Sequence, residues 1–141
     1  MEIINQYHQT ASVFITRVFL GFLFFFQGYD SVFRVKIKNV IETFQNTFSN
    51  KGIPKILTVW ASWFNSCSAL TGGFLLIFGL FEYCALFLLA INLIIAAVGF
   101  GINTPMWDTR FVFPRLLLLL FLLVAPRTWN TWSLDYLLFK I

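Results

Sequence analysis

Residues 83–102 read YCALFLLAINLIIAAVGFGI, a stretch without a charged side chain. A helix rises about 1.5 Å per residue, so this stretch is long enough to cross the hydrocarbon core of a bilayer, roughly 30 Å thick. The whole chain is similarly apolar, because 59% of its 141 residues are hydrophobic and 11% are charged. A chain this short has too little interior to hide so much apolar surface from water. The sequence therefore predicts an integral membrane protein and argues against a soluble domain or a nucleic-acid-binding protein.

Apolar segments on both sides of this stretch predict a bundle of four transmembrane helices. The expected spans are residues 11–33, 56–81, 83–102 and 110–126. A tight turn at Glu82 joins the second span to the third. Pro114 and Pro126 suit the two ends of the last span, because proline fits the first turn of a helix and resists its continuation. The expected fold class is an all-α membrane protein in which residues 1–141 form a single transmembrane domain.

The long connection between the first two spans has the pattern of an amphipathic helix over about residues 37–49. Ile37, Ile41, Phe44 and Phe48 recur at i, i+4, i+7 and i+11, which places them on one face of a helix. Polar side chains occupy the other faces. Two placements follow from this pattern: the helix lies in the membrane interface, or it packs over the end of the bundle.

Basic residues predict how the bundle is oriented. Four spans place both termini on one side and the two longer connections on the other. The side of the longer connections carries Arg34, Lys36, Lys38, Lys51, Lys55 and Arg110. The side of the termini carries Arg127 and Lys140. Because the cytoplasmic face usually holds the excess of Lys and Arg, we expect the long connection in the cytoplasm and both termini in the periplasm.

Charged side chains inside or beside the spans are expected to find partners in the bundle, because an unpaired charge is costly there. Arg17 lies at the membrane level of Glu82 and Asp135, and Asp30 lies at a depth similar to that of Arg115. One interpretation is two structural ion pairs that fix the order of the helices. The other is a polar cavity that binds a quinone headgroup or relays protons. That cavity would be lined by Arg17, Gln27, Asn92 and Asp135.

Small residues on the spans are predicted to bring helices close together. Gly21 and Gly28 share one face of the first span, and Gly72 and Gly73 belong to small-x-x-x-small pairs in the second. Asn92 in the third span is expected to form a hydrogen bond across helices.

Reactive side chains are scarce. Cys67 and Cys84 are the two cysteines and do not form a C-x-x-C pair, and His8 is the single histidine. A haem or zinc centre would lack ligands within this chain. We therefore expect no metal site and no independent catalysis, and a quinone is the one cofactor that the cavity interpretation adds.

Three short motifs resemble those of the DoxX-like membrane proteins, a family that includes the MauE and DoxD relatives. Residues 17–28 are similar to the family's R-x-x-x-G…G opening, residues 72–80 (GGFLLIFGL) to its G-G-x-L-L-I-x-G-L stretch, and residues 133–135 to its S-L-D ending. The resemblance covers nearly the whole chain and implies a four-helix bundle in the bacterial cytoplasmic membrane. The chain departs from the pattern at residues 68–71 (SALT), where relatives often carry Glu, and at Arg115, where many carry an acid.

Relatives in this family are associated with redox systems, such as thiosulfate:quinone oxidation, amine-dehydrogenase maturation and thiol stress responses. They usually act beside catalytic partners. The resemblance therefore implies an accessory or assembly subunit of a larger redox-associated membrane complex, in contact with lipid and with other subunits. A quinone-binding subunit of an oxidoreductase is the alternative hypothesis, and a small transporter or carrier is the third.

Overall fold

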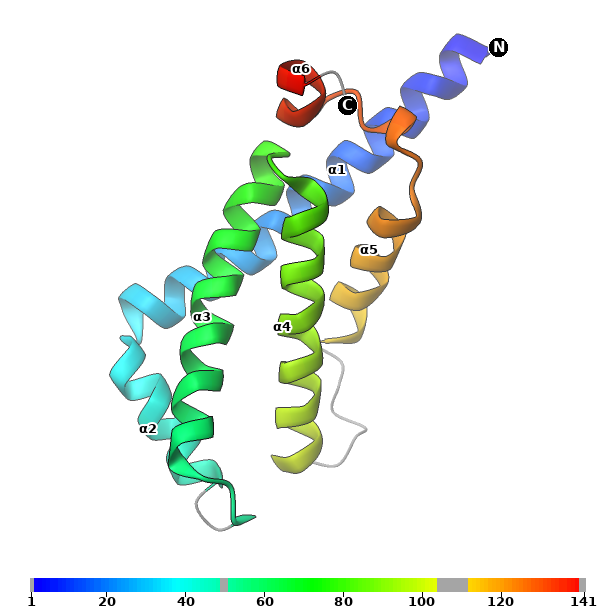
Figure 1. Cartoon of the computed structure of the whole chain (residues 1–141). Coiled ribbons are helices and arrows are strands. Elements are labelled where there is room, and N and C mark those ends of the chain that lie inside the picture. Colours follow the sequence, from blue (N-terminus) through cyan, green and yellow to red (C-terminus); the bar gives the residue numbers. More distant parts are fainter. Residues whose placement is uncertain (1, 49–50, 104–111, 140–141) are drawn as a thin grey trace.

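The computed structural model describes residues 2–48, 51–103 and 112–139, and this part of the chain contains helices and turns but no strand (Figure 1). The elements are α1 (Glu2–Tyr29), η1 (Asp30–Arg34), α2 (Ile37–Phe48), α3 (Lys55–Phe78), α4 (Glu82–Asn103), α5 (Phe113–Val124), η4 (Arg127–Trp129) and α6 (Leu134–Phe139). The predicted all-α fold class is confirmed.

Three helical segments of the described chain are long and apolar enough to cross a membrane. They are Gln6–Arg34, Lys55–Phe78 and Glu82–Ile102, and they correspond to the first three predicted spans. The α-helix of the first segment starts well before residue 11 and continues into η1, a single π-helical turn. Residues 110 and 111 of the fourth predicted span lie outside the described residues, and α5 is a shorter apolar helix.

The turn between α3 and α4 follows from local backbone geometry. Gly79 ends α3 in the left-handed conformation, with φ at +66°, and its N–H donates to the carbonyl of Leu76 at 3.1 Å. Glycine adopts this conformation without a steric penalty, so it is the usual residue after a helix end. Phe81 also has a positive φ, +46°, and α4 begins at Glu82. The second span therefore ends at Phe78, three residues before its predicted end.

Glycines let α1 and α3 pack with their backbones close together. A Cβ atom at Gly28 would lie 2.6 Å from the Cα of Leu70, and one at Gly73 would lie 2.8 Å from the carbonyl oxygen of Gly21. Gly72 belongs to a different contact, since a Cβ there would lie 2.8 Å from the side chain of Leu89 in α4. Three of the four glycines singled out in the sequence thus lie where α1 meets α3, and the fourth lies where α3 meets α4.

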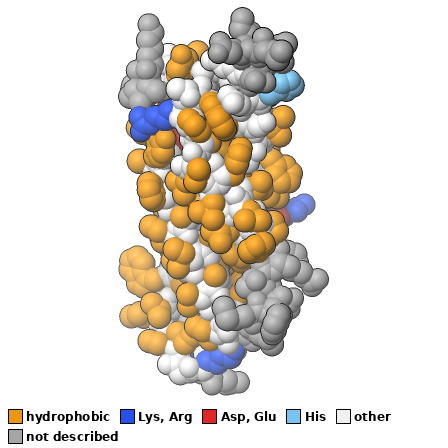
Figure 2. Space-filling model, turned by 90° about the vertical axis from the view of Figure 1, so that its right-hand side faces the viewer, with side chains coloured by type: hydrophobic (Ala, Val, Ile, Leu, Met, Phe, Trp, Pro, Cys, Tyr) orange, Lys and Arg blue, Asp and Glu red, His pale blue; other side chains and the backbone are white. Residues whose placement is uncertain are grey.

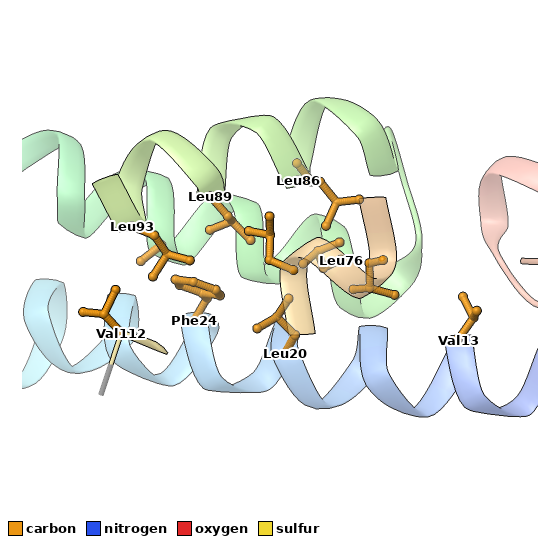
Figure 3. Close-up of a cluster of buried hydrophobic side chains, with 12 residues drawn as sticks. Val13, Leu20, Phe24, Leu76, Leu86, Leu89, Leu93 and Val112 are labelled. Carbon is orange, nitrogen blue, oxygen red and sulfur yellow. The ribbon is translucent and has the colours of Figure 1, made fainter. Parts of the chain in front are cut away.

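The hydrophobic core lies between α1, α3, α4 and α5. Leu20 and Phe24 of α1 are fully buried and lie across from Leu89 of α4, with Leu76 of α3 nearby (Figure 3). Leu119 of α5 completes this cluster. The core therefore draws on every long helix of the described chain.

Helix α2 packs along α3, near the end of the bundle opposite the two chain termini (Figure 1). Ile37 and Phe44 on its apolar face are half-buried and Phe48 is buried, whereas Lys38 and Glu42 are exposed. The predicted apolar face is thus the face turned inward. The structure shows the helix against the bundle, and its polar side faces outward, as a position at the membrane interface also requires.

Hydrophobic side chains dominate the outer surface. Figure 2 shows them over most of the length of one face of the molecule. Phe87 and Ile94 of α4 are more than half exposed, as are Phe19 of α1 and Trp60 of α3. Such a surface suits lipid contact, in agreement with the predicted membrane protein.

Candidate functional site

A cluster of hydrogen-bonded polar groups lies at the end of the bundle that holds the chain termini, and we call it the polar junction. It consists of Arg17, Glu82, Asn130, Asp135 and the carbonyl of Trp132. These residues come from α1, from the start of α4 and from the carboxy-terminal segment. The junction therefore joins the first helix of the chain to its last residues.

Arg17 is the largest fully buried side chain of the described structure. Its Nη1 donates to Asn130 Oδ1 at 2.8 Å, and its Nη2 donates to the carbonyl of Trp132 at 2.7 Å. The ring of Phe14, one turn earlier in α1, lies 5.6 Å from the guanidinium carbon. The Nε atom has no hydrogen-bond partner. The carboxy-terminal segment thus provides both hydrogen-bond acceptors for the buried guanidinium of Arg17.

Glu82 reaches Arg17 through an intermediate. Asn130 Nδ2 donates to Glu82 Oε2, while Asn130 Oδ1 accepts from Arg17. The expected direct ion pair of Arg17 with Glu82 or Asp135 is absent from the salt bridges of the described residues. Arg17 nevertheless lies close enough to both carboxylates for electrostatic attraction, as their positions in the sequence predict. The physical reason for the indirect arrangement is the amide, which satisfies a cation and an anion with one side chain.

Asp135 caps the amino terminus of α4 from the far end of the chain. Its Oδ1 accepts from the N–H of Phe81 at 2.9 Å, and its Oδ2 accepts from the N–H of Glu82 at 3.0 Å. Its own N–H donates to the carbonyl of Gly79 at 3.0 Å. The first N–H groups of a helix lack partners within the helix, so a carboxylate there satisfies donors and complements the helix dipole. Asp135 thus holds the turn at both of its ends.

A cavity of about 240 Å³ adjoins the junction. Glu82, Asn130 and Asp135 contribute to its lining, together with Arg127 and Tyr83. The guanidinium of Arg127 lies 4.5 Å from the ring centre of Tyr83, and its Nε donates to the hydroxyl at 3.2 Å. Two carboxylates and a cation therefore face this small space.

Asn92 links α4 to α3 near the middle of both helices. Its Nδ2 donates to the carbonyl of Asn65 at 2.8 Å and to Ser68 Oγ at 2.6 Å. The side chain is fully buried, and its Oδ1 has no hydrogen-bond partner. The hydrogen bond across helices that the sequence predicts is present.

Asp30 and Arg115, expected to pair with each other, have other partners. Asp30 accepts from Arg34 one helical turn later, at 3.2 Å. Arg115 Nη1 donates to Gln27 Oε1, and its guanidinium carbon lies 5.5 Å from the ring centre of Phe24. A pair four residues apart on one helix is easier to form than a pair between helices, and the neutral amide of Gln27 serves Arg115 instead.

The four residues proposed for a single polar pocket are not brought together at either of two cavities in the described part of the chain. Asp135 lines the cavity beside the junction, whereas Gln27 lines a second cavity beneath α2. Arg17 and Gln27 are ten residues apart in one helix, which separates them by about 15 Å along its axis. Asn92 is buried between helices in contact with α3. The four residues are all polar and all belong to or adjoin the spans, but these shared properties did not predict that they lie close together.

Asn130 is a junction residue that the sequence did not indicate, and Ser133, which the sequence indicated only through the S-L-D motif, donates to the carbonyl of Asn130 at 3.0 Å. Ser133 Oγ accepts from the N–H of Tyr136 at 3.1 Å and so caps the short helix α6. The signal for this cap was present, because serine is a preferred N-cap residue and Asp135 follows in the first turn. Asn130 carried no comparable signal, since an asparagine after a proline reads as an ordinary turn residue.

Both cysteines are free and exposed, Cys67 on α3 and Cys84 on α4. The described residues contain no cluster of three His, Cys, Asp or Glu side chains that could hold a metal ion.

The family model described as DoxX matches residues 12–102. The match runs from within α1 to the end of α4 and includes Arg17, Gln27 and Asn92. No curated protein and no solved structure matches the chain.

Proposed function

Since this chain belongs to the DoxX family of membrane proteins, we propose that it acts as an accessory or assembly subunit of a larger, redox-associated membrane complex. The observation that supports the proposal is that polar side chains in the bundle form hydrogen bonds to other segments of the same chain. Arg17, Asn92 and Asp135 each bond to another segment of this chain. Side chains engaged in this way hold helices in register, and catalysis is then the task of a partner protein.

The outer surface offers room for partner subunits as well as lipid. Large aromatic side chains stand out from two helices, Phe19 and Phe26 from α1 and Trp60 and Trp63 from α3. Aromatic residues provide much contact area at a low cost in side-chain entropy, and they are frequent at the centres of protein interfaces.

We further propose four spans in the bacterial cytoplasmic membrane, with residues 1–141 as one domain and both termini in the periplasm. The fourth span would be residues 110–126, built around the apolar helix α5, which covers roughly 18 Å of the membrane. The position of both termini at one end of the bundle supports this even number of spans (Figure 1).

Purification of the tagged chain from its own membrane tests the accessory role. In a mild detergent the chain should be recovered with partner subunits in a fixed stoichiometry, measured by quantitative mass spectrometry. An unrelated membrane protein with the same tag and expression level is the control. Recovery of the chain alone, together with no cross-linked partner in intact membranes, would argue decisively against this function.

A further inference from the structure

A second cavity, beneath α2, has the size and the chemistry of a ligand site. Its volume is about 380 Å³, within the range of small-molecule pockets. It is lined by residues of α1, η1, α2, α3 and α4 and is open on one side. It lies at the opposite end of the bundle from the polar junction and shares no lining residue with the cavity there.

The lining of this α2 cavity is uncharged at every residue that the structure describes. Its polar groups are the amides of Gln27 and Asn65 and the hydroxyls of Ser31, Thr43 and Thr47. Burying an ion against such a wall would be costly, because no charge lines it: the nearby cation, Arg115, bonds to Gln27 and does not itself contribute to the lining. A neutral head that exchanges hydrogen bonds with amides and hydroxyls fits the lining.

The side chain of Gln27 determines which kind of hydrogen-bonding atom a ligand should present to the cavity. Its Oε1 accepts from Arg115, which uses one of the two lone pairs of that oxygen, so the two N–H groups of Nε2 predominate in what remains for a ligand. A hydrogen bond from a cation polarises the amide and strengthens its own donation. The preferred ligand atom is therefore an acceptor, such as a carbonyl oxygen.

The remaining walls are apolar and leave room for a hydrocarbon body. Phe44 and Phe48 of α2 share this lining with Ala96 and Gly99 of α4, which have almost no side chain. A Cβ atom added at Gly99 would meet one atom within 4 Å, the Cζ of Phe48 at 3.9 Å. Gly99 thus borders open space, unlike Gly28 and Gly73 at the tight contact of α1 and α3.

We infer that the α2 cavity binds an uncharged amphiphile from the membrane, whose carbonyl-bearing head lies near Gln27 and Asn65 and whose apolar body lies against α2. Membrane quinones and neutral glycerides share this chemistry. The inference goes beyond the accessory role and does not require a partner protein.

Thermal unfolding of the purified full-length chain in lipid nanodiscs tests the inference with three probes. Decylubiquinone and dioctanoylglycerol are neutral, carbonyl-bearing amphiphiles, and decanoate is a charged one. At least one neutral probe should raise the unfolding midpoint in a saturable manner, and decanoate should not. A response to the quinone or to the glyceride alone assigns the class, and a response to both supports the shared chemistry.

Two glycines of α4 provide a matched pair of variants. Gly99→Phe fills the cavity and should abolish the midpoint shift, whereas Gly101→Phe adds the same side chain where no atom lies within 4 Å and should leave the shift intact. Asn65→Leu removes a polar lining group without filling the space, and it should weaken probe binding about tenfold. This variant tests the site even if Gly99→Phe fails to fold.

Three outcomes would overturn the inference. The first is the absence of a saturable shift with either neutral probe. The second is a shift with decanoate equal to or larger than that with the neutral probes. The third is an equal loss of binding in Gly99→Phe and Gly101→Phe, which would locate the probes on the lipid-facing surface.

Discussion

Arg17 makes both of its hydrogen bonds to residues more than a hundred positions later in the chain. Its charge also offsets that of Glu82, which is itself nearly buried. Removing one charge from a buried network leaves the opposite charge buried without a partner, and this lowers the stability of the fold strongly. The bridge between Arg34 and Asp30 is the opposite case, because both side chains lie at the molecular surface, with exposed fractions of 76% and 47%.

We therefore predict that Arg17→Met lowers the free energy of unfolding by about 3 kcal/mol or more. Titration with sodium dodecyl sulfate in mixed micelles measures this quantity. Adding Glu82→Gln to the same chain should recover part of the loss, because the stranded carboxylate becomes a neutral amide. Arg34→Met, the control, should change stability by no more than about 1 kcal/mol. Equal effects at the two arginines would mean that the junction contributes no stability.

The sequence predicted that Arg17 needs partners, but it did not predict which residues accept its hydrogen bonds. Its depth in an apolar helix, together with Glu82 and Asp135 at the same level, identified the charges that now surround it. Asn130 lies in a short turn after Pro126, and its position depends on how that turn folds back over α1. Side chains held by turn geometry leave no periodic signal, so the mediating residue could not be predicted.

At the scale of elements, the α3–α4 turn depends on a residue outside both helices. Phe81 has a left-handed backbone, which costs a residue with a side chain roughly 1 kcal/mol or more. Asp135 accepts the N–H groups of Phe81 and Glu82 and so stabilises this conformation. An N-cap side chain, located directly before a helix in the sequence, normally accepts hydrogen bonds from the first N–H groups of that helix. At α4 this role belongs to the carboxylate of Asp135, which lies more than 50 residues later.

Asp135→Ala should release both N–H groups at a cost of about 1 kcal/mol. Amide hydrogen exchange at Phe81 and Glu82 should become about five times faster, while exchange near the middle of α4 stays unchanged. Asp135→Asn retains one carbonyl acceptor and should give a smaller effect. Unaltered exchange at both amides in the alanine variant would show that the cap is dispensable.

The contact between α1 and α3 gives a second prediction at this scale. Gly28→Ala places a methyl group against the backbone of Leu70, so the helices must separate, and we expect a loss of about 1–3 kcal/mol. Gly101→Ala meets open space in α4 and should be neutral or stabilising by up to about 1 kcal/mol, because alanine favours helix. Both values come from the same mixed-micelle titration. A neutral Gly28→Ala would contradict the close approach of the two backbones.

Elements were more predictable than the contacts between them. The 3.6-residue spacing of Ile37, Ile41 and Phe44 predicted both α2 and its inward face, because periodicity is a property of the helix itself. The spacing carries no information about which helix receives that face. Asp30 and Arg115 were matched by depth alone, whereas helix rotation and a nearer partner, Arg34, decide the actual pairing.

For the whole molecule, the asymmetric distribution of basic residues predicts the orientation. In a background of Cys67→Ala and Cys84→Ala, His8→Cys should react with a membrane-impermeant maleimide added to cells with an opened outer membrane. Glu42→Cys on the exposed face of α2 should react only after the inner membrane is permeabilised. The reverse pattern would place α2 and its lysines in the periplasm, and labelling at both positions would indicate mixed insertion.

The distance in sequence between Arg17 and its partners has a consequence for biosynthesis. Asn130 follows Arg17 by 113 positions, so at roughly 5–20 residues per second it is translated about 6–23 seconds later. Throughout that interval α1 has been made but its guanidinium lacks its final acceptors. Until the tail is made, water, lipid headgroups or an insertion factor must supply the acceptors that Asn130 and Trp132 provide in the folded chain.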